Sequence, residues 1–381
     1  MADIFEGIFG QPRVREFLRA CVSSDKVSHA YLFCGPAGSN KTQAAFAFAR
    51  AILCSGNPCS DCEGCASESC AQIARKTHPD VHYFAPEGAQ GYVVDQIREL
   101  VADTSLAPIK ANRKVYIIDR VDLLGTAAAN AFLKTLEEPP SDVVLVLLGR
   151  TRESVLPTIV SRCQVVPFRH IPASEAAGIL VQNTGCTLPE ASIAIEACGG
   201  SITKAAAFLR SKERSQFRQK VVFALASLAR ADDLDVLDYA ADIVLASKAP
   251  LDEVRREQDR MMEERAEFLN KAALKTLETR NKRMLSQASF EFLHQATSIA
   301  RSWLRDVAMV CSGAEDLAIN VDCLDAVRDC AGRTQLARVC EAYARVSDAD
   351  SAISYNVSPQ VSIEAMLFEI REVLYAERRC R

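Results

Sequence analysis

Five cysteines fall between residues 54 and 70, in a chain that has 15 cysteines among its 381 residues. Cys59, Cys62 and Cys65 follow one another with two residues between neighbours, and Cys54 precedes them. Four thiolates make a closed tetrahedral zinc site, which is structural because it leaves no coordination position for a substrate. The spacing therefore predicts a structural zinc ion with these four thiolates as its ligands.

Alternatives to that ligand set remain open. Cys70 follows the run and competes with Cys54 as the fourth ligand. The cluster is also compatible with redox thiols, or with buried cysteines that pack as small apolar residues. Disulfides are not expected, because we place the chain in the cytosol, where thiols stay reduced.

A second set of residues has the composition of a phosphate-binding loop. The run Gly35-Pro-Ala-Gly-Ser-Asn-Lys-Thr42 separates an apolar, strand-like segment from an alanine-rich helical one. In such a loop, backbone N–H groups around Gly35 and Gly38 and the helix N-terminus hold the phosphates of a nucleotide. Lys41 would reach the terminal phosphates, and Thr42 would hold Mg²⁺.

Asn40 departs from this motif, which asks for glycine directly before the lysine. Asparagine tolerates a left-handed backbone better than most residues, but its Cβ crowds the path of the phosphates. The departure puts ATP binding in doubt. It leaves two predictions: a loop that still binds ATP, and a degenerate loop that keeps its shape and binds nothing.

A predicted strand over residues 115–119 ends in an acidic side chain, Asp119. In a P-loop ATPase the strand-end aspartate supports Mg²⁺, and the next acidic residue polarises the attacking water. Arg120 takes that next position here, and a cation cannot act as a general base. Asp122 is a poor substitute, because its side chain is expected to point elsewhere. We predict that Asp119 can coordinate a metal without a hydrolytic carboxylate beside it; alternatively, the two aspartates only cap the turn.

Strands and helices that could position these motifs alternate along the first part of the chain. Continuous apolar runs, rather than alternation with period two, are typical of a parallel sheet covered on both faces. After residue 168 the strand patterns stop and helical patterns continue. The predicted strands are 29–34, 80–84, 114–119 and 143–148, and the predicted helices of this part are 1–20, 41–53, 94–102 and 126–138.

Three more segments carry a resemblance to a known family. They are His29-Ala-Tyr-Leu-Phe33, Asn130-Ala-Phe-Leu-Lys-Thr-Leu-Glu-Glu-Pro-Pro140 and Leu156-Pro-Thr-Ile-Val-Ser-Arg-Cys163. With the phosphate-binding loop and the cysteine cluster, they resemble the bacterial clamp-loader branch of the AAA+ ATPases. The resemblance is dense over residues 5–168 and thinner over the helical remainder.

The resemblance implies an α/β AAA+ P-loop module with a parallel sheet, a small helical lid domain and an all-α C-terminal collar domain. Residues 1–168 are predicted to form the nucleotide-binding-like domain, with the zinc module at about 54–70. Residues 169–212 are predicted to form the lid, and residues 213–381 the collar through which subunits join.

Within that branch some subunits hydrolyse ATP, and one type keeps a worn nucleotide site. Asn40 and Arg120 depart from the ATPase pattern, and Thr203 stands where hydrolysing subunits place a nucleotide-sensing arginine. We therefore predict a stator-like assembly subunit with little or no ATPase activity of its own. The alternative is a subunit that itself binds and hydrolyses ATP. A recombination or helicase-loading AAA+ factor is a third interpretation, which the cysteine module disfavours.

Ser161-Arg162-Cys163 resembles the motif whose arginine enters the ATP site of a neighbouring subunit. A planar guanidinium there neutralises charge on the γ-phosphate in the transition state. The resemblance implies that Arg162 acts in trans as an arginine finger. The alternative is a solvated arginine at the start of a strand.

The implied partners are the other clamp-loader subunits and, through the complex, the sliding clamp and primed DNA. The net charge is −4, and no stripe of Lys and Arg with interleaved aromatic residues is present. A protein that binds nucleic acid without partner subunits usually has such a stripe. Any DNA contact is therefore expected to be shared with partners.

Two remaining features concern location and the helical part. The N-terminus has no signal-peptide pattern and no run of 18 apolar residues occurs, so we expect a cytoplasmic chain without membrane contact. Residues 252–283 carry eight acidic and nine basic side chains at helical spacing. They predict one long exposed helix, which either packs along a partner or is only a solvated face.

Overall fold

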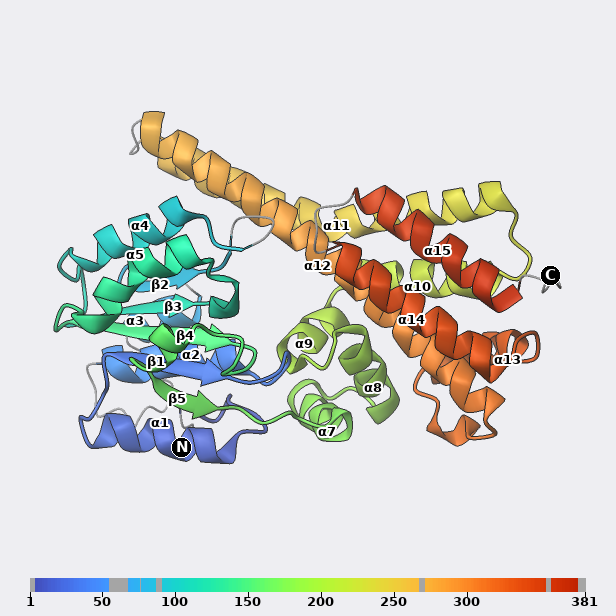
Figure 1. The fold of residues 1–381 in the computed structure, drawn as a ribbon, viewed down its shortest axis with the longest axis horizontal. Helices are drawn as coiled ribbons and strands as arrows, with labels where there is room; N and C mark the ends of the chain where they lie inside the picture. The colour runs from blue at the N-terminus through green and yellow to red at the C-terminus, as the bar shows by residue number, and fades with distance from the viewer. Residues whose placement is uncertain are drawn as a thin grey trace. The chain divides into compact units, whose positions relative to one another are not determined.

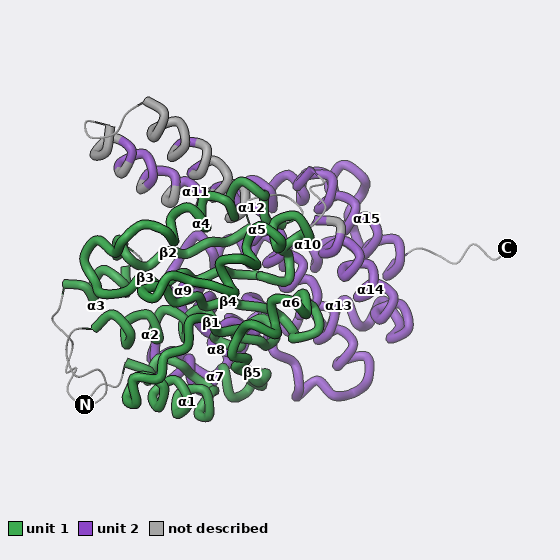
Figure 2. The backbone as a smooth tube through the Cα atoms, turned by 60° about the vertical axis from the view of Figure 1, so that its left-hand side comes forward, with its two compact units in different colours: residues 1–176 green, residues 177–381 purple. Residues whose placement is uncertain are grey.

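The computed structural model describes residues 4–54, 68–75, 77–86, 91–266, 271–353 and 358–375. The chain divides into two compact units, residues 1–176 and residues 177–381, which Figure 2 shows in different colours. The first unit contains the predicted α/β module. Whether residues 169–212 form a domain separate from the collar stays a prediction.

A five-stranded parallel sheet lies at the centre of the first unit, with the strand order β2-β3-β4-β1-β5 (Figure 1). Four strands lie at the predicted places. The fifth was not among the predicted strands, although the alternative for Arg162 placed the start of a strand here; only Val166 in it is buried. The strands are β1 (Ala30–Cys34), β2 (Val81–Phe84), β3 (Lys114–Ile118), β4 (Val143–Gly149) and β5 (Gln164–Pro167).

Helices cover both faces of this sheet. The helix predicted for residues 1–20 begins only at Pro12, a residue that favours the first position of a helix. The short helices α3 and α6 were not predicted. The helices are α1 (Pro12–Ser23), α2 (Lys41–Leu53), α3 (Glu68–Ala74), α4 (Val94–Thr104), α5 (Thr126–Glu137) and α6 (Pro157–Val160).

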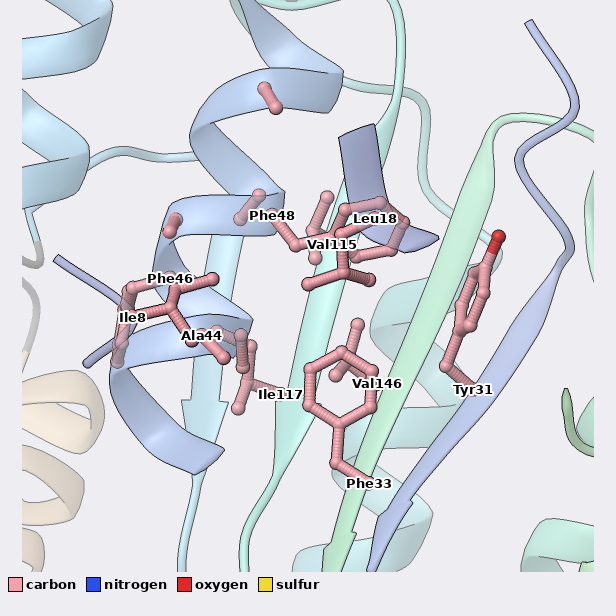
Figure 3. Packing of buried hydrophobic residues seen from close by; sticks show 14 of the residues in the cluster. Ile8, Leu18, Tyr31, Phe33, Ala44, Phe46, Phe48, Val115, Ile117 and Val146 are labelled. Atoms are coloured by element: carbon pink, nitrogen blue, oxygen red, sulfur yellow. The ribbon is translucent and has the colours of Figure 1, made fainter. Parts of the chain in front are cut away.

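Two apolar clusters hold the layers together, one on each face of the sheet. On the face that α1 and α2 cover, Phe48 packs edge-on against Tyr31, with ring centroids 5.0 Å apart, and lies near Val115 (Figure 3). On the other face, Leu32 and Phe132 belong to the cluster under α4 and α5. Because successive strand residues point to opposite faces, these clusters fix the strands and hence their ends.

The described part of the second unit is helical. Its two longest helices, α11 and α12, lie side by side (Figure 1), so the prediction of one continuous helix over residues 252–283 was wrong. No helix in the described ranges is long and apolar enough to cross a membrane. The helices from the unit boundary onward are α7 (Ala173–Thr184), α8 (Leu188–Ala197), α9 (Ile202–Arg210), α10 (Lys212–Ser227), α11 (Asp233–Ala266), α12 (Lys271–Cys311), α13 (Leu324–Ala331), α14 (Leu336–Ile353) and α15 (Pro359–Tyr375).

Candidate nucleotide site and candidate arginine finger

The predicted phosphate-binding loop lies where a nucleotide site requires it, between β1 and α2. Gly38 has φ +77°, a conformation that favours glycine. A Cβ on Gly35 would lie 2.6 Å from the backbone oxygen of Phe168, so no larger residue fits there. Both glycines are therefore needed for the shape of the loop, whether or not a nucleotide binds.

Asn40 adopts the left-handed backbone conformation, with φ 72° and ψ 20°. Its side-chain Nδ2 donates a hydrogen bond to the backbone oxygen of Gly7, at 3.2 Å. The buried side chain of Gln11 holds the same loop, because its Nε2 donates to the backbone oxygen of Ser39 at 3.1 Å. Asparagine thus keeps the backbone shape expected of glycine here and ties the loop to the N-terminal segment.

Lys41 is engaged by its own loop. Its Nζ donates to the backbone oxygens of Gly35 and Pro36, at 2.6 and 2.8 Å, and to the hydroxyl of Ser39 at 3.2 Å. Burial lowers the pKa of Lys41, against the opposing charges of Asp119 and Asp122. Thr42 follows, half-buried in the first turn of α2. A phosphate would have to replace these loop oxygens as the partner of the ammonium group.

Asp119 comes directly after β3, and both of its carboxylate oxygens accept hydrogen bonds. The hydroxyl of Tyr83 donates to Oδ2 at 2.5 Å, and the backbone N–H of Arg120 donates to Oδ1 at 2.9 Å. A second hydroxyl, that of Tyr92, donates to the backbone oxygen of Asp119. Asp119 is therefore held by its own chain at the position where a metal would approach.

Arg120 and Asp122 complete this edge of the sheet. Arg120 is exposed and has a left-handed backbone, with φ 50°. The charge of Asp122 raises the pKa of Lys41 and of Cys34, against the lowering of the Lys41 pKa by burial; that its side chain points away from the loop stays a prediction. Its Oδ1 is buried and has no hydrogen-bond partner among the described residues.

Sequence reasoning missed Arg150, which directly follows β4. In the register of the sheet Gly149 pairs with Cys34, so Arg150 stands beside the start of the loop. Its positive charge lowers the pKa of Lys41 further. The usable signal was its place after a buried strand, because the carboxyl ends of parallel strands meet at one edge and that is where ligands bind.

Arg162 lies at the amino ends of the parallel strands, opposite the carboxyl ends where the phosphate-binding loop lies. We call these two ends of the sheet its amino-end edge and its carboxyl-end edge. Arg162 follows α6 and precedes β5, whose Gln164 pairs with Tyr31 near the start of β1. A strand of five residues spans about 16 Å, so the fold places Arg162 away from its own chain's Lys41. Beside it, burial raises the pKa of the Cys163 thiol to about 12, which keeps that thiol neutral.

The Arg162 guanidinium has three partners. Nη1 donates to the backbone oxygen of Thr158 at 2.8 Å and to the Ser161 hydroxyl at 3.1 Å, and Nη2 pairs with the carboxylate of Glu137. The side chain is 34% exposed, so it reaches the surface in spite of these contacts.

The structure describes only part of the cysteine cluster. Cys59, Cys62 and Cys65 lie outside the described residues. Cys54 is half-buried directly after α2, and Cys70 is buried on α3. The described ranges contain no group of three or more metal-binding side chains, so the zinc site stays a prediction.

Thr203 and Lys204 lie on α9 in the second unit. The Nζ atom of Lys204 is 3.3 Å from the carboxylate of Glu291 on α12, and the side chain is 54% exposed. Lys204 is therefore an exposed helix residue that pairs with a neighbouring helix of the same unit.

Comparison with known proteins finds relatives of the first unit. The family model described as "DNA polymerase III, delta subunit" matches residues 10–172. The DNA polymerase III subunit delta' of Bacillus subtilis is 32% identical over 212 residues, which are 56% of this chain and 63% of that protein. Over this region the chain is similar to clamp-loader subunits of DNA polymerase III.

The family includes subunits of different kinds, and this chain resembles more than one. The Bacillus subtilis subunit tau is 38% identical over 175 residues, 46% of this chain and 30% of that protein. A solved DNA polymerase III gamma subunit-related protein from Thermotoga maritima covers 94% of this chain and 98% of its own, with 18% identity and a TM-score of 0.46. The chain thus spans less than two thirds of the length of these two Bacillus subtilis relatives.

Proposed function

We propose that this chain is the delta-prime, stator-like subunit of a DNA polymerase III clamp loader. In that role it is a non-catalytic subunit of the polymerase holoenzyme. It helps to open the sliding clamp and to place it on primed DNA, with little or no ATPase activity of its own. Its partners are the delta and gamma/tau types of subunit directly, and the clamp and primed DNA through the complex.

The observation that carries this proposal concerns the two residues that directly follow β3, Asp119 and Arg120. Arg120 stands where hydrolysis needs a carboxylate, and both oxygens of Asp119 already accept hydrogen bonds. A guanidinium stays protonated and cannot take a proton from water. Since Lys41 is also held by its own loop, both Lys41 and Asp119 have partners without a nucleotide.

The position of Arg162 supports a role in trans. It lies at the amino-end edge of the sheet, away from this chain's own loop, and reaches the surface. An arginine finger contributes by neutralising charge on the γ-phosphate in the transition state. In the proposed complex, that phosphate belongs to the ATP of a neighbouring subunit.

We further propose that Cys54, Cys59, Cys62 and Cys65 hold a structural zinc ion. Cys54 directly follows α2, a helix that the structure describes. Cys70, which competes with it as the fourth ligand, lies on α3. Four thiolates would fix the segment between α2 and α3 without offering a position for chemistry.

A second candidate is a gamma/tau-type subunit that itself binds and hydrolyses ATP. Two observations favour it: Asn40 keeps the left-handed conformation of the loop, and Asp122 has a buried carboxylate oxygen without a hydrogen-bond partner among the described residues. In this candidate Asp122 would take over the work of the missing carboxylate.

ATP hydrolysis by the purified full chain separates the two candidates. The first predicts background turnover that primed DNA does not stimulate and that Lys41→Ala does not change. The second predicts DNA-stimulated turnover, abolished by Lys41→Ala and by Asp122→Asn. Turnover that both substitutions abolish would replace the first proposal by the second.

A further inference from the structure

Glu137 occupies a place in the fold that helix stability does not explain. It is the last residue of α5, and Glu138 follows it as the C-cap. A carboxylate at the C-terminal end of a helix meets the negative end of the helix dipole, which disfavours it. Two neighbouring glutamates at this end therefore need another reason.

Contacts separate these two glutamates. The carboxylate of Glu137 pairs with Nη2 of Arg162, while Nη1 is held by Thr158 and Ser161. Both terminal nitrogens of the guanidinium thus have partners within the chain. Glu138 is exposed, and the described residues give it no ion pair with Arg162.

We propose that Glu137 is a positioning residue that restrains Arg162 until a neighbouring ATP site engages it. The inference rests on the proposed function, because it requires Arg162 to act in trans. The carboxylate competes with the γ-phosphate for Nη2. It also cancels positive charge that would otherwise act on that phosphate, since opposite charges in contact screen each other's field.

Exposure makes the restraint reversible. Glu137 is 48% exposed and Arg162 is 34% exposed, and ion pairs of this kind are weak. A triphosphate in a neighbour's site carries more charge than one carboxylate and can take the guanidinium from it. Removing the carboxylate should therefore raise the rate at that site by at most about five-fold, the factor that corresponds to a surface ion pair.

The experiment compares five forms of the full chain in clamp loaders reconstituted with the other subunits at matched assembly. They are wild type, Glu137→Gln, the control Glu138→Gln, and Arg162→Ala with and without Glu137→Gln. ATP turnover is measured with sliding clamp and primed DNA. We expect Glu137→Gln to raise the turnover of the complex by less than about five-fold, because only one of its sites is affected. Glu138→Gln, which changes charge by the same amount, should leave turnover unchanged.

The double variant distinguishes a restraint on Arg162 from an effect of Glu137→Gln on turnover that does not involve Arg162. In the Arg162→Ala background, Glu137→Gln should change nothing, because its target is gone. Turnover that Glu137→Gln leaves unchanged or lowers, or raises equally without Arg162, would overturn the inference. If Arg162→Ala alone leaves turnover at the wild-type level, the proposed trans role fails instead, and that outcome is read independently.

Discussion

The two edges of the parallel sheet differ in what they do with charged groups. At the carboxyl-end edge, Lys41 and Asp119 find their partners within their own chain. At the amino-end edge, Arg162 is tied only by a surface ion pair and two hydrogen bonds, and stays one-third exposed. The carboxyl-end edge thus has the geometry of a nucleotide site whose charged side chains are paired within it, whereas Arg162 reaches the surface, as the proposed role in trans requires.

The largest expected effect is at the outward edge. Arg162→Ala should lower ATP turnover and clamp loading by the reconstituted complex. Arginine fingers measured in GTPases are worth about 10³–10⁵ in rate at the site they serve. The loss for the whole complex should be smaller, because other sites keep their own arginines.

A lysine at this position should rescue poorly, because an ammonium lacks the planar, two-pronged donor geometry of a guanidinium. The assay is clamp loading at matched assembly, with both variants. Full loading with Arg162→Ala would make Arg162 a structural residue and remove the contrast between the edges.

Loss of zinc is expected to have the next largest effect, which is on the stability of the folded chain. The phosphate-binding loop should be unaffected. We expect about one zinc per chain by metal analysis of protein purified without added zinc. Cys59→Ser should release it and lower the free energy of unfolding by several kcal/mol, on the order expected where metal binding is coupled to folding. Cys54 lies at the far end of α2 from Lys41, so nucleotide binding should not change.

The same measurement decides the fourth ligand. Release of zinc by Cys54→Ser but not by Cys70→Ser supports the predicted set. The reverse result would assign the fourth position to Cys70, and a metal-free wild-type chain would contradict the site altogether.

A smaller effect concerns Asp80, which precedes β2 at the amino-end edge. Its buried carboxylate accepts backbone hydrogen bonds from Ile109, Lys110 and Ala111, at 2.6 to 2.8 Å. Burial opposes the charged form, but these three bonds outweigh it and hold the pKa of Asp80 below its ordinary value of 3.8. Asp80→Asn should lower the free energy of unfolding by about 2 kcal/mol at pH 7.

The pH dependence of that difference has a definite sign. A depressed pKa stabilises the folded state at pH values above the ordinary pKa, and the stabilisation is lost as the pH falls toward the folded-state value. Denaturant unfolding should therefore show a constant difference between pH 5 and 8 that shrinks below about pH 4. Asp95→Asn, at an exposed carboxylate, is the matched control. Equal stability of both variants at pH 7 would contradict the account.

The smallest expected effect is at the loop itself. Asn40→Gly removes the hydrogen bond to Gly7 but suits the left-handed backbone, so stability should change by less than about 0.5 kcal/mol. ATP turnover should stay at background, because Arg120 remains. If this one substitution gave ATP turnover above background, Asn40 alone would be what prevents hydrolysis at the carboxyl-end edge.

Much of this contrast could be predicted from local sequence. The loop, α2 and the strands that carry it follow from glycine positions and apolar runs. The partners of Asp119 and Arg162 could not be predicted, because Tyr83 and Glu137 come from distant parts of the chain. β5 was not among the predicted strands, since one buried residue makes no pattern, and Arg150 gained its meaning only from the register of β4 against β1.

The central claim is that this chain does not use its own nucleotide site and serves a neighbour's. The most direct test measures ATP turnover by reconstituted clamp loaders that carry either Lys41→Ala or Arg162→Ala in this chain alone. The account predicts turnover at the wild-type level with Lys41→Ala and a clear loss with Arg162→Ala. A loss with Lys41→Ala and wild-type turnover with Arg162→Ala would contradict it.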